Sequence, residues 1–140
     1  MNGLIDMLKG GNHSLVIAKG GERHVFDTRG IATLLQLVTD ESPVMQGATI
    51  ADKVVGKAAA ALMIAGGAKA VHALLISDGA IKLLRDAGVA AGYEERTDHI
   101  MNRTASGWCP MELACRNCRT AGECITAIRN TIENMKKNKQ

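Results

Sequence analysis

Four cysteines near the end of this 140-residue chain are its side chains best suited to chemistry. Cys109, Cys115, Cys118 and Cys124 are spaced C-x5-C-x2-C-x5-C, and the first 108 residues contain no cysteine. Because thiolates are both metal ligands and nucleophiles, this crowding predicts a metal centre or thiol chemistry. The Cys115–Cys118 pair has the spacing that lets two thiolates bind one ion, and all four cysteines could hold zinc or an iron–sulfur cluster. Spacing alone does not distinguish the two, and packing alone would explain Cys124, which falls on an apolar helix stripe.

Cys109 is also a candidate nucleophile because of its place at the start of a predicted helix. Pro110 favours the first helical position, which makes Cys109 the N-cap and puts Glu112 at the third position. The positive end of a helix lowers the pKa of a nearby thiol. Glu112 is then a candidate acid or base, unless it caps a backbone N–H. The alternative is that Cys109 is a small buried residue in a tight turn.

A second group of candidate residues surrounds two lysines. Residues 52–65 are apolar on nearly every side, which predicts a buried helix whose only charges, Asp52, Lys53 and Lys57, lie in its first turn and a half. Lys53 and Lys57 would share one face of that helix. Because cations oppose the dipole at a helix N-terminus, the pair predicts a bound anion, with Gly56 permitting its close approach. The alternative is an Asp52–Lys53 surface pair, with Lys57 extending to solvent.

The sequence lacks the signatures that would name a reaction. None of His13, His24, His72 and His99 begins an H-x-E motif, and the C-x2-C pair follows Ala114 rather than a proline. The zinc deaminase pattern is therefore absent. The Walker A, H-E-x-x-H, G-x-S-x-G and G-x-G-x-x-G patterns are absent too.

Length and composition restrict the class of protein. A hydrophobic content of 46% over 140 residues predicts one globular domain, residues 1–140. One Phe, one Tyr and one Trp disfavour a stacking platform for nucleic acid. With no apolar run long enough to span a bilayer and no export signal, we expect a cytoplasmic protein with reduced thiols and no membrane partner. Residues 116–140 hold 6 Lys or Arg and 2 Asp or Glu, typical of a solvated helix end.

Hydrophobic periodicity predicts strands alternating with helices after an initial hairpin. The hairpin is expected at residues 14–19 and 23–27, joined through Gly20-Gly21. Besides the helix over residues 52–65, the further predicted elements are a helical turn at 4–8, helices at 30–40, 77–87, 110–116 and 123–137, and strands at 71–76 and 89–94. This order predicts an α/β sheet layered with helices.

The chain resembles the prokaryotic domain-of-unknown-function 1893 family. The resemblance is carried by the run Ala51–Ala60 (ADKVVGKAAA), by Asn102-Arg103, and by Trp108–Glu112 (WCPME), and it extends from about Ser14 to the last helix. It implies a cytidine-deaminase-like fold, which is a three-layer α/β/α sandwich with a mixed sheet. Members of the family lack the zinc ligands of true deaminases, and no activity has been assigned to them.

The resemblance also implies where the candidate residues lie. Asp52, Lys53 and Lys57 would take the helix that carries H-x-E in deaminases, and Ser77-Asp78-Gly79 would follow the strand that leads to P-C-x-x-C. Asn102, Arg103, Cys109 and Glu112 would line the same cleft. The cysteines at 115, 118 and 124 are not part of the family motif, so a metal there would be a local addition.

These observations predict a protein that binds a small anionic molecule. Lys53, Gly56, Lys57, Asn102 and Arg103 would bind the anion. Cys109, with Asp52 and Glu112, would form the reactive group of an enzyme. Two alternatives stay open: a non-catalytic ligand sensor that signals through its basic C-terminal helix, and a protein that holds zinc or an iron–sulfur cluster on Cys109, Cys115, Cys118 and Cys124. The enzyme and both alternatives are each compatible with a homo-oligomer.

Overall fold

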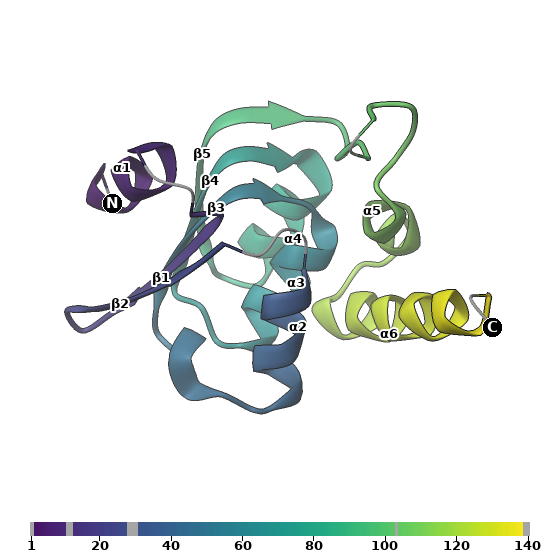
Figure 1. Cartoon of the computed structure of the whole chain (residues 1–140), viewed down its shortest axis with the longest axis horizontal. Coiled ribbons are helices and arrows are strands. Elements are labelled where there is room, and N and C mark those ends of the chain that lie inside the picture. Colours follow the sequence, from purple (N-terminus) through teal and green to yellow (C-terminus); the bar gives the residue numbers. More distant parts are fainter. Residues whose placement is uncertain (1, 11–12, 28–30, 103, 139–140) are drawn as a thin grey trace.

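The computed structural model describes residues 2–10, 13–27, 31–102 and 104–138 (Figure 1). Its elements follow the chain in the order α1 (Asn2–Gly10), β1 (Leu15–Lys19), β2 (Glu22–Phe26), α2 (Ala32–Thr39), the 3-10 helix η1 (Pro43–Met45), β3 (Thr49–Val55), α3 (Lys57–Ala65), β4 (Ala70–Ser77), α4 (Asp78–Asp86), β5 (Ala90–Thr97), α5 (Pro110–Cys115) and α6 (Ala121–Asn138).

The strands form one five-stranded mixed sheet in the order β2-β1-β3-β4-β5. Strand β1 runs antiparallel to both of its neighbours, whereas β3, β4 and β5 are parallel. Each parallel connection is made by a helix, α3 and then α4, as parallel strands require. The carboxyl ends of β3, β4 and β5 therefore meet at one edge, beside α5 (Figure 1). Strands β2 and β5 are the two outer strands.

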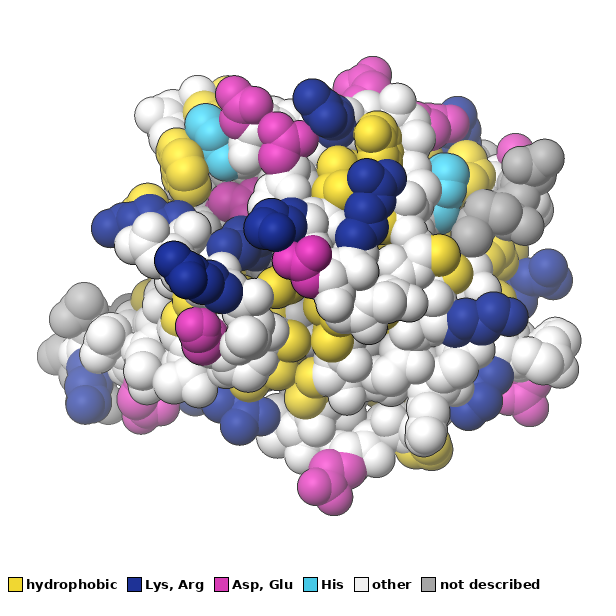
Figure 2. Space-filling view, turned by 180° about the vertical axis from the view of Figure 1, so that it is seen from behind, with side chains coloured by type: hydrophobic (Ala, Val, Ile, Leu, Met, Phe, Trp, Pro, Cys, Tyr) yellow, Lys and Arg dark blue, Asp and Glu magenta, His cyan; other side chains and the backbone are white. Residues whose placement is uncertain are grey.

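Helices flank both faces of the sheet. Helix α1 packs on one face, where Leu4, Ile5 and Leu8 contact Val16 and Ala51. The other face carries α2, α3 and α4, and α6 packs along α3. Figure 1 shows α1 apart from these helices. On the surface seen from behind, Lys and Arg are interspersed with Asp and Glu (Figure 2).

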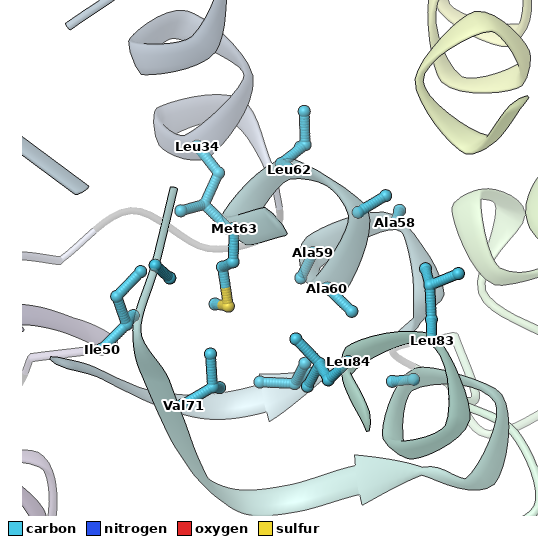
Figure 3. Close-up of a cluster of buried hydrophobic side chains, with 14 of the residues drawn as sticks. Leu34, Ile50, Ala58, Ala59, Ala60, Leu62, Met63, Val71, Leu83 and Leu84 are labelled. Carbon is cyan, nitrogen blue, oxygen red and sulfur yellow. The ribbon is translucent and has the colours of Figure 1, made fainter. Parts of the chain in front are cut away.

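Helix α3 lies at the centre of the main core. Its residues 58–63 are all buried, and four of these six are alanine. Small side chains let the helix approach the sheet and its neighbours closely, while the larger side chain of Met63 extends toward Leu34 and Ile50 (Figure 3). The sequence therefore predicts correctly that this helix is buried, but the predicted first residue of the helix is wrong.

The helix predicted over residues 52–65 is two elements. Residues 52–55 belong to β3, Gly56 is extended at φ −95° and ψ −177°, and the helix begins at Lys57. A central strand covered on both faces is as apolar as a buried helix, so periodicity does not separate the two. Val54 and Val55 are β-branched and favour the strand. As a consequence, Asp52 and Lys53 do not lie at a helix N-terminus.

The other predicted elements are confirmed among the described residues, with bounds that differ by up to a few residues, whereas residue 30, the predicted start of the helix over 30–40, lies outside the described residues. Gly20 and Gly21 have φ values of 57° and 89°, which suits the two-residue hairpin turn between β1 and β2. Ser77 caps α4 by accepting a hydrogen bond from the backbone N–H of Ala80 at 3.3 Å. Cys109 is the N-cap of α5 and Pro110 its first residue.

Candidate functional site

A carboxylate of the chain itself lies at the start of α3, where the sequence predicted a bound anion. The side chain of Glu112 on α5 is only 4% exposed. Its Oε1 accepts a hydrogen bond from the backbone N–H of Lys57 at 2.9 Å, and its Oε2 accepts one from the N–H of Ile100 at 2.6 Å. The Ser77 hydroxyl donates to Oε1 at 3.4 Å. The positive end of α3 therefore has an internal anion.

Gly56 makes room for this carboxylate. A Cβ atom on Gly56 would lie 3.2 Å from Oε2 and 3.3 Å from Oε1 of Glu112. The sequence predicted that Gly56 lets an anion approach closely, and in the structure this anion is the carboxylate of Glu112. Because both of its oxygens are held by hydrogen bonds, Glu112 fastens α5 and the segment at Ile100 to α3.

The side chain of Lys57 runs from the start of α3 to the end of α5. Its ammonium donates to the carbonyl oxygen of Cys118 at 2.6 Å and to that of Arg116 at 3.3 Å. On the way it crosses the start of α4, where a Cβ atom on Gly79 would lie 2.7 Å from Cδ and 2.9 Å from Cγ of Lys57. Lys57 and Glu112 together fill the space between the first turns of α3 and α4.

Asp52 and Lys53 lie elsewhere, on the central strand β3. Asp52 pairs with Leu15 and Ala73 across the sheet. Asp52 is partly buried, and this burial raises its pKa to about 7 against hydrogen bonds from the backbone of Val54 and Lys53. Side chains alternate along a strand, so Lys53 lies on the same face of the sheet as Ala51, the face on which α1 packs. Contrary to what the sequence predicted, Lys53 and Lys57 therefore do not share one helix face.

The segment between β5 and α5 holds the remaining candidate residues. Asn102 orders its own turn, since its Oδ1 accepts from the Ser106 N–H at 3.1 Å and from the Thr104 hydroxyl at 3.1 Å. Arg103 lies outside the described residues. The backbone N–H of Cys109 donates to the Ile100 carbonyl at 2.8 Å, and Cys109 is partly exposed.

Three of the four cysteines come together at the corner between α5 and α6. Cys115 and Cys124 are fully buried and Cys118, in the turn, is partly exposed. The Cys115 thiol donates a hydrogen bond to the backbone carbonyl oxygen of Cys124 at 3.8 Å, and the three thiols influence one another electrostatically. We call these three residues the thiol cluster. Cys109 stands apart because α5 separates it from Cys115 by six residues, or about 9 Å along the helix.

The pKa values of the three thiols in the cluster are shifted in different directions. The hydrogen bond from Cys124 holds the pKa of the Cys115 thiol below its ordinary value, although burial acts the other way. The same bond, together with burial, raises the pKa of Cys124. Burial also raises the pKa of Cys118. The positive charge of Lys57 acts to lower the pKa of all three thiols.

The metal site predicted from the four cysteines is not assembled in the part of the chain that the structure describes. Among those residues, no group of three or more His, Cys, Asp or Glu side chains is arranged to hold an ion. A groove of about 440 Å³ lies near the thiol cluster, lined by Pro110, Leu113, Ala114, Arg116, Asn117 and Thr131.

Sequence reasoning missed two features of this region. The first is the partnership between Glu112 and α3, for which no local pattern exists because the two lie 55 residues apart. The second is the stack of His99 on Trp108, with ring centroids 4.0 Å apart and planes at 14°. This stack stabilises the segment between β5 and α5, and an antiparallel backbone bridge between Met101 and Trp108 does the same.

The fold and the site define a mixed α/β domain with helices on both faces of a five-stranded sheet and a buried Lys57–Glu112 junction at one sheet edge. The chain belongs to the DUF1893 family, described as a domain of unknown function, whose model matches residues 3–132.

A solved structure supports the fold. The crystal structure of a DUF1893 family protein from Thermotoga maritima is similar, with a TM-score of 0.80 and 24% sequence identity, over 92% of this chain and 86% of that chain. No curated protein matches the sequence. Among the described residues, no helix has the length and apolar character to cross a membrane.

Proposed function

We propose that this protein is a thiol–disulfide redox protein whose reactive group is the thiol cluster. One observation carries the proposal: Cys115, Cys118 and Cys124 lie in one packed cluster, where the Cys115 thiol donates to the Cys124 carbonyl oxygen at 3.8 Å and Cys118 is partly exposed. Neighbouring thiols need little movement to form a disulfide, whereas Cys109 lies farther away along α5. Burial raises the pKa of the Cys118 thiol, and the Lys57 ammonium beside it acts in the opposite direction, toward the thiolate form that reacts.

The proposed reaction is exchange with the disulfide of a small thiol. The Cys118 thiolate attacks one sulfur of that disulfide, so that a mixed disulfide forms and one small thiolate leaves. Cys124 then loses its proton and attacks the Cys118 sulfur, which releases the second small thiolate. Two protons and two electrons pass from the two cysteines to the small disulfide, giving two small thiols and a Cys118–Cys124 disulfide. Cys118 reacts first because it is the exposed member.

For the scaffold we propose the cytidine-deaminase-like fold that the family resemblance implies. The mixed sheet with helices on both faces is compatible with it, and α3 and α4 begin side by side after β3 and β4. A deaminase would need zinc between these two helix starts. Here the Lys57 side chain crosses Gly79 in that space, so we expect no deamination.

Binding of a small anion at Lys53, Lys57 and Arg103 stays a prediction with less support. Glu112 already satisfies the first N–H of α3, and the Lys57 ammonium is bound to carbonyl oxygens. Lys53 lies on β3, and Arg103 is outside the described residues.

The proposal is tested by redox equilibration. Purified protein is held in mixtures of reduced and oxidised glutathione, trapped with iodoacetamide and mapped by peptide mass spectrometry. The wild type should form a Cys118–Cys124 disulfide. Cys124→Ser should stop at a mixed disulfide between Cys118 and glutathione, and Cys118→Ser should form neither. The matched control Cys109→Ser should behave like the wild type.

Two outcomes would overturn the redox proposal. One is a wild-type protein whose cluster thiols all stay reduced in pure oxidised glutathione. The other is about one zinc ion or iron–sulfur cluster per chain in protein purified without oxygen, together with thiols that resist oxidation. The second outcome would instead support the metal site that was predicted from the sequence.

A further inference from the structure

We infer that Lys57 is the positioning residue of the thiol cluster, and that Gly79 is glycine to leave the path of its side chain open. This inference rests on the proposed redox function and assigns it a residue outside the cysteine-bearing segment. The two observations that carry it are the hydrogen bonds of the ammonium and the close approach to Gly79.

The hydrogen bonds fix the turn that carries Cys118. The last carbonyl groups of a helix lack partners within the helix, and those at the end of α5 include that of Arg116. An ammonium has three donors and no acceptor, so Lys57 can satisfy two carbonyl groups at once. Its bonds to the Cys118 and Arg116 oxygens hold the turn against α3. The turn is thereby kept where Cys118 meets Cys124.

The charge of Lys57 acts on the cluster from the side of α3. It favours the thiolate form of Cys115, Cys118 and Cys124 alike, while Glu112 on α5 acts against it at Cys115, and Glu123 on α6 acts against it at Cys118. Burial and the neighbouring thiols outweigh this charge at Cys118 and Cys124, whose pKa values stay raised, so both thiols of the proposed disulfide keep their protons at neutral pH. Lys57 should therefore act on the disulfide through the position of Cys118, and its loss should make the disulfide harder to form.

Gly79 provides an independent way to move Lys57. A Cβ atom there would come within 2.7 Å of Cδ of Lys57, which is closer than unbonded carbon atoms approach. Gly79 lies in the first turn of α4, where alanine suits the helix better than glycine. Gly79→Ala should therefore keep the fold while pushing the lysine aside. It changes no charge and no cysteine.

The experiment compares four variants with the wild type in the same glutathione mixtures. Lys57→Met should make disulfide formation about tenfold less favourable at equilibrium, and Gly79→Ala should shift it in the same direction by a smaller factor. Lys57→Arg keeps hydrogen-bond donors for the two carbonyl groups and should retain most of the wild-type behaviour. Lys82→Met is the matched control, because Lys82 is 79% exposed on α4 and paired with Asp86, and it should change nothing.

The outcomes separate this inference from the redox function itself. If the wild type forms no disulfide, the proposed function fails. If the wild type forms one and Lys57→Met oxidises with the same equilibrium constant, the redox function stands and the role of Lys57 is wrong. Equal shifts in Lys57→Met and Lys57→Arg would overturn the role of the hydrogen bonds that Lys57 donates. Should Lys57→Met not fold, an unchanged equilibrium in Gly79→Ala would still overturn the inference.

Discussion

At the scale of single residues, Asp52 is a carboxyl group enclosed within the sheet. Burial raises its pKa from 3.8 to about 7, so the folded protein holds the proton over a pH range in which the unfolded chain has released it. Its contribution to stability is fully present below about pH 4 and is lost as the pH rises to about 7. At neutral pH the charged carboxylate destabilises the fold.

We expect Asp52→Asn to stabilise the protein at pH 7 and to leave it nearly unchanged at pH 4. An amide has the shape of the carboxyl group without its charge, so the variant should avoid a loss of about 3 kcal/mol in the free energy of unfolding between these pH values. The free energy of unfolding measured in urea at each pH gives the test. Asp86→Asn, at an exposed position on α4, is the control. Equal pH slopes for wild type and Asp52→Asn would contradict the prediction.

At the scale of elements, α5 is a short helix held by one carboxylate. It has only six residues, too few to be stable alone, and its position depends on what it contacts. Glu112 links it to α3 and to the segment at Ile100 through two backbone hydrogen bonds. These bonds join three segments of the chain at a buried point.

Glu112→Ala should therefore lower the free energy of unfolding by about 2–5 kcal/mol, because it leaves the N–H groups of Lys57 and Ile100 without their acceptor. Glu112→Gln keeps one acceptor oxygen, and its loss should be smaller. Urea unfolding measures both. Glu133→Gln, on the exposed side of α6, should stay within about 0.5 kcal/mol of the wild type. The prediction would be wrong if Glu112→Ala matched that control.

Local patterns predicted most elements but few of the contacts between them. The Gly20-Gly21 turn and the Cys109-Pro110 helix start have local signatures, and both are confirmed. Residues 52–55 were misassigned because an apolar segment buried on both sides has no diagnostic period. That Glu112 meets Lys57, and that Lys57 passes Gly79, follows from packing between distant segments. The spacing of the cysteines could not reveal that α5 keeps Cys109 apart.

At the scale of the whole molecule, the sheet separates a large core from a small one. The small core, between α1 and the sheet, consists of Leu4, Ile5, Leu8, Val16 and Ala51. The large core surrounds α3 on the opposite face. A helix that packs through so few side chains can open without the rest of the protein unfolding.

We expect Leu8→Ala to release α1 alone. Amides of α1 should then exchange hydrogen much faster, whereas those of β3 and β4 should keep their protection, because the large core is untouched. Leu84→Ala, which removes an equally buried side chain from the large core, should speed exchange in both regions. Hydrogen exchange followed by mass spectrometry distinguishes the two patterns. Faster exchange of β3 and β4 in Leu8→Ala would show that the cores unfold together.

The outer strands of the sheet have a consequence for behaviour at high concentration. Strand β2 carries exposed Glu22, Arg23 and His24, and β5 carries exposed Glu94, Glu95 and Arg96. Charges along an edge strand discourage another chain from adding to the sheet, which is the usual route to fibrils. Both outer strands are thus protected against amyloid-like stacking by their charges.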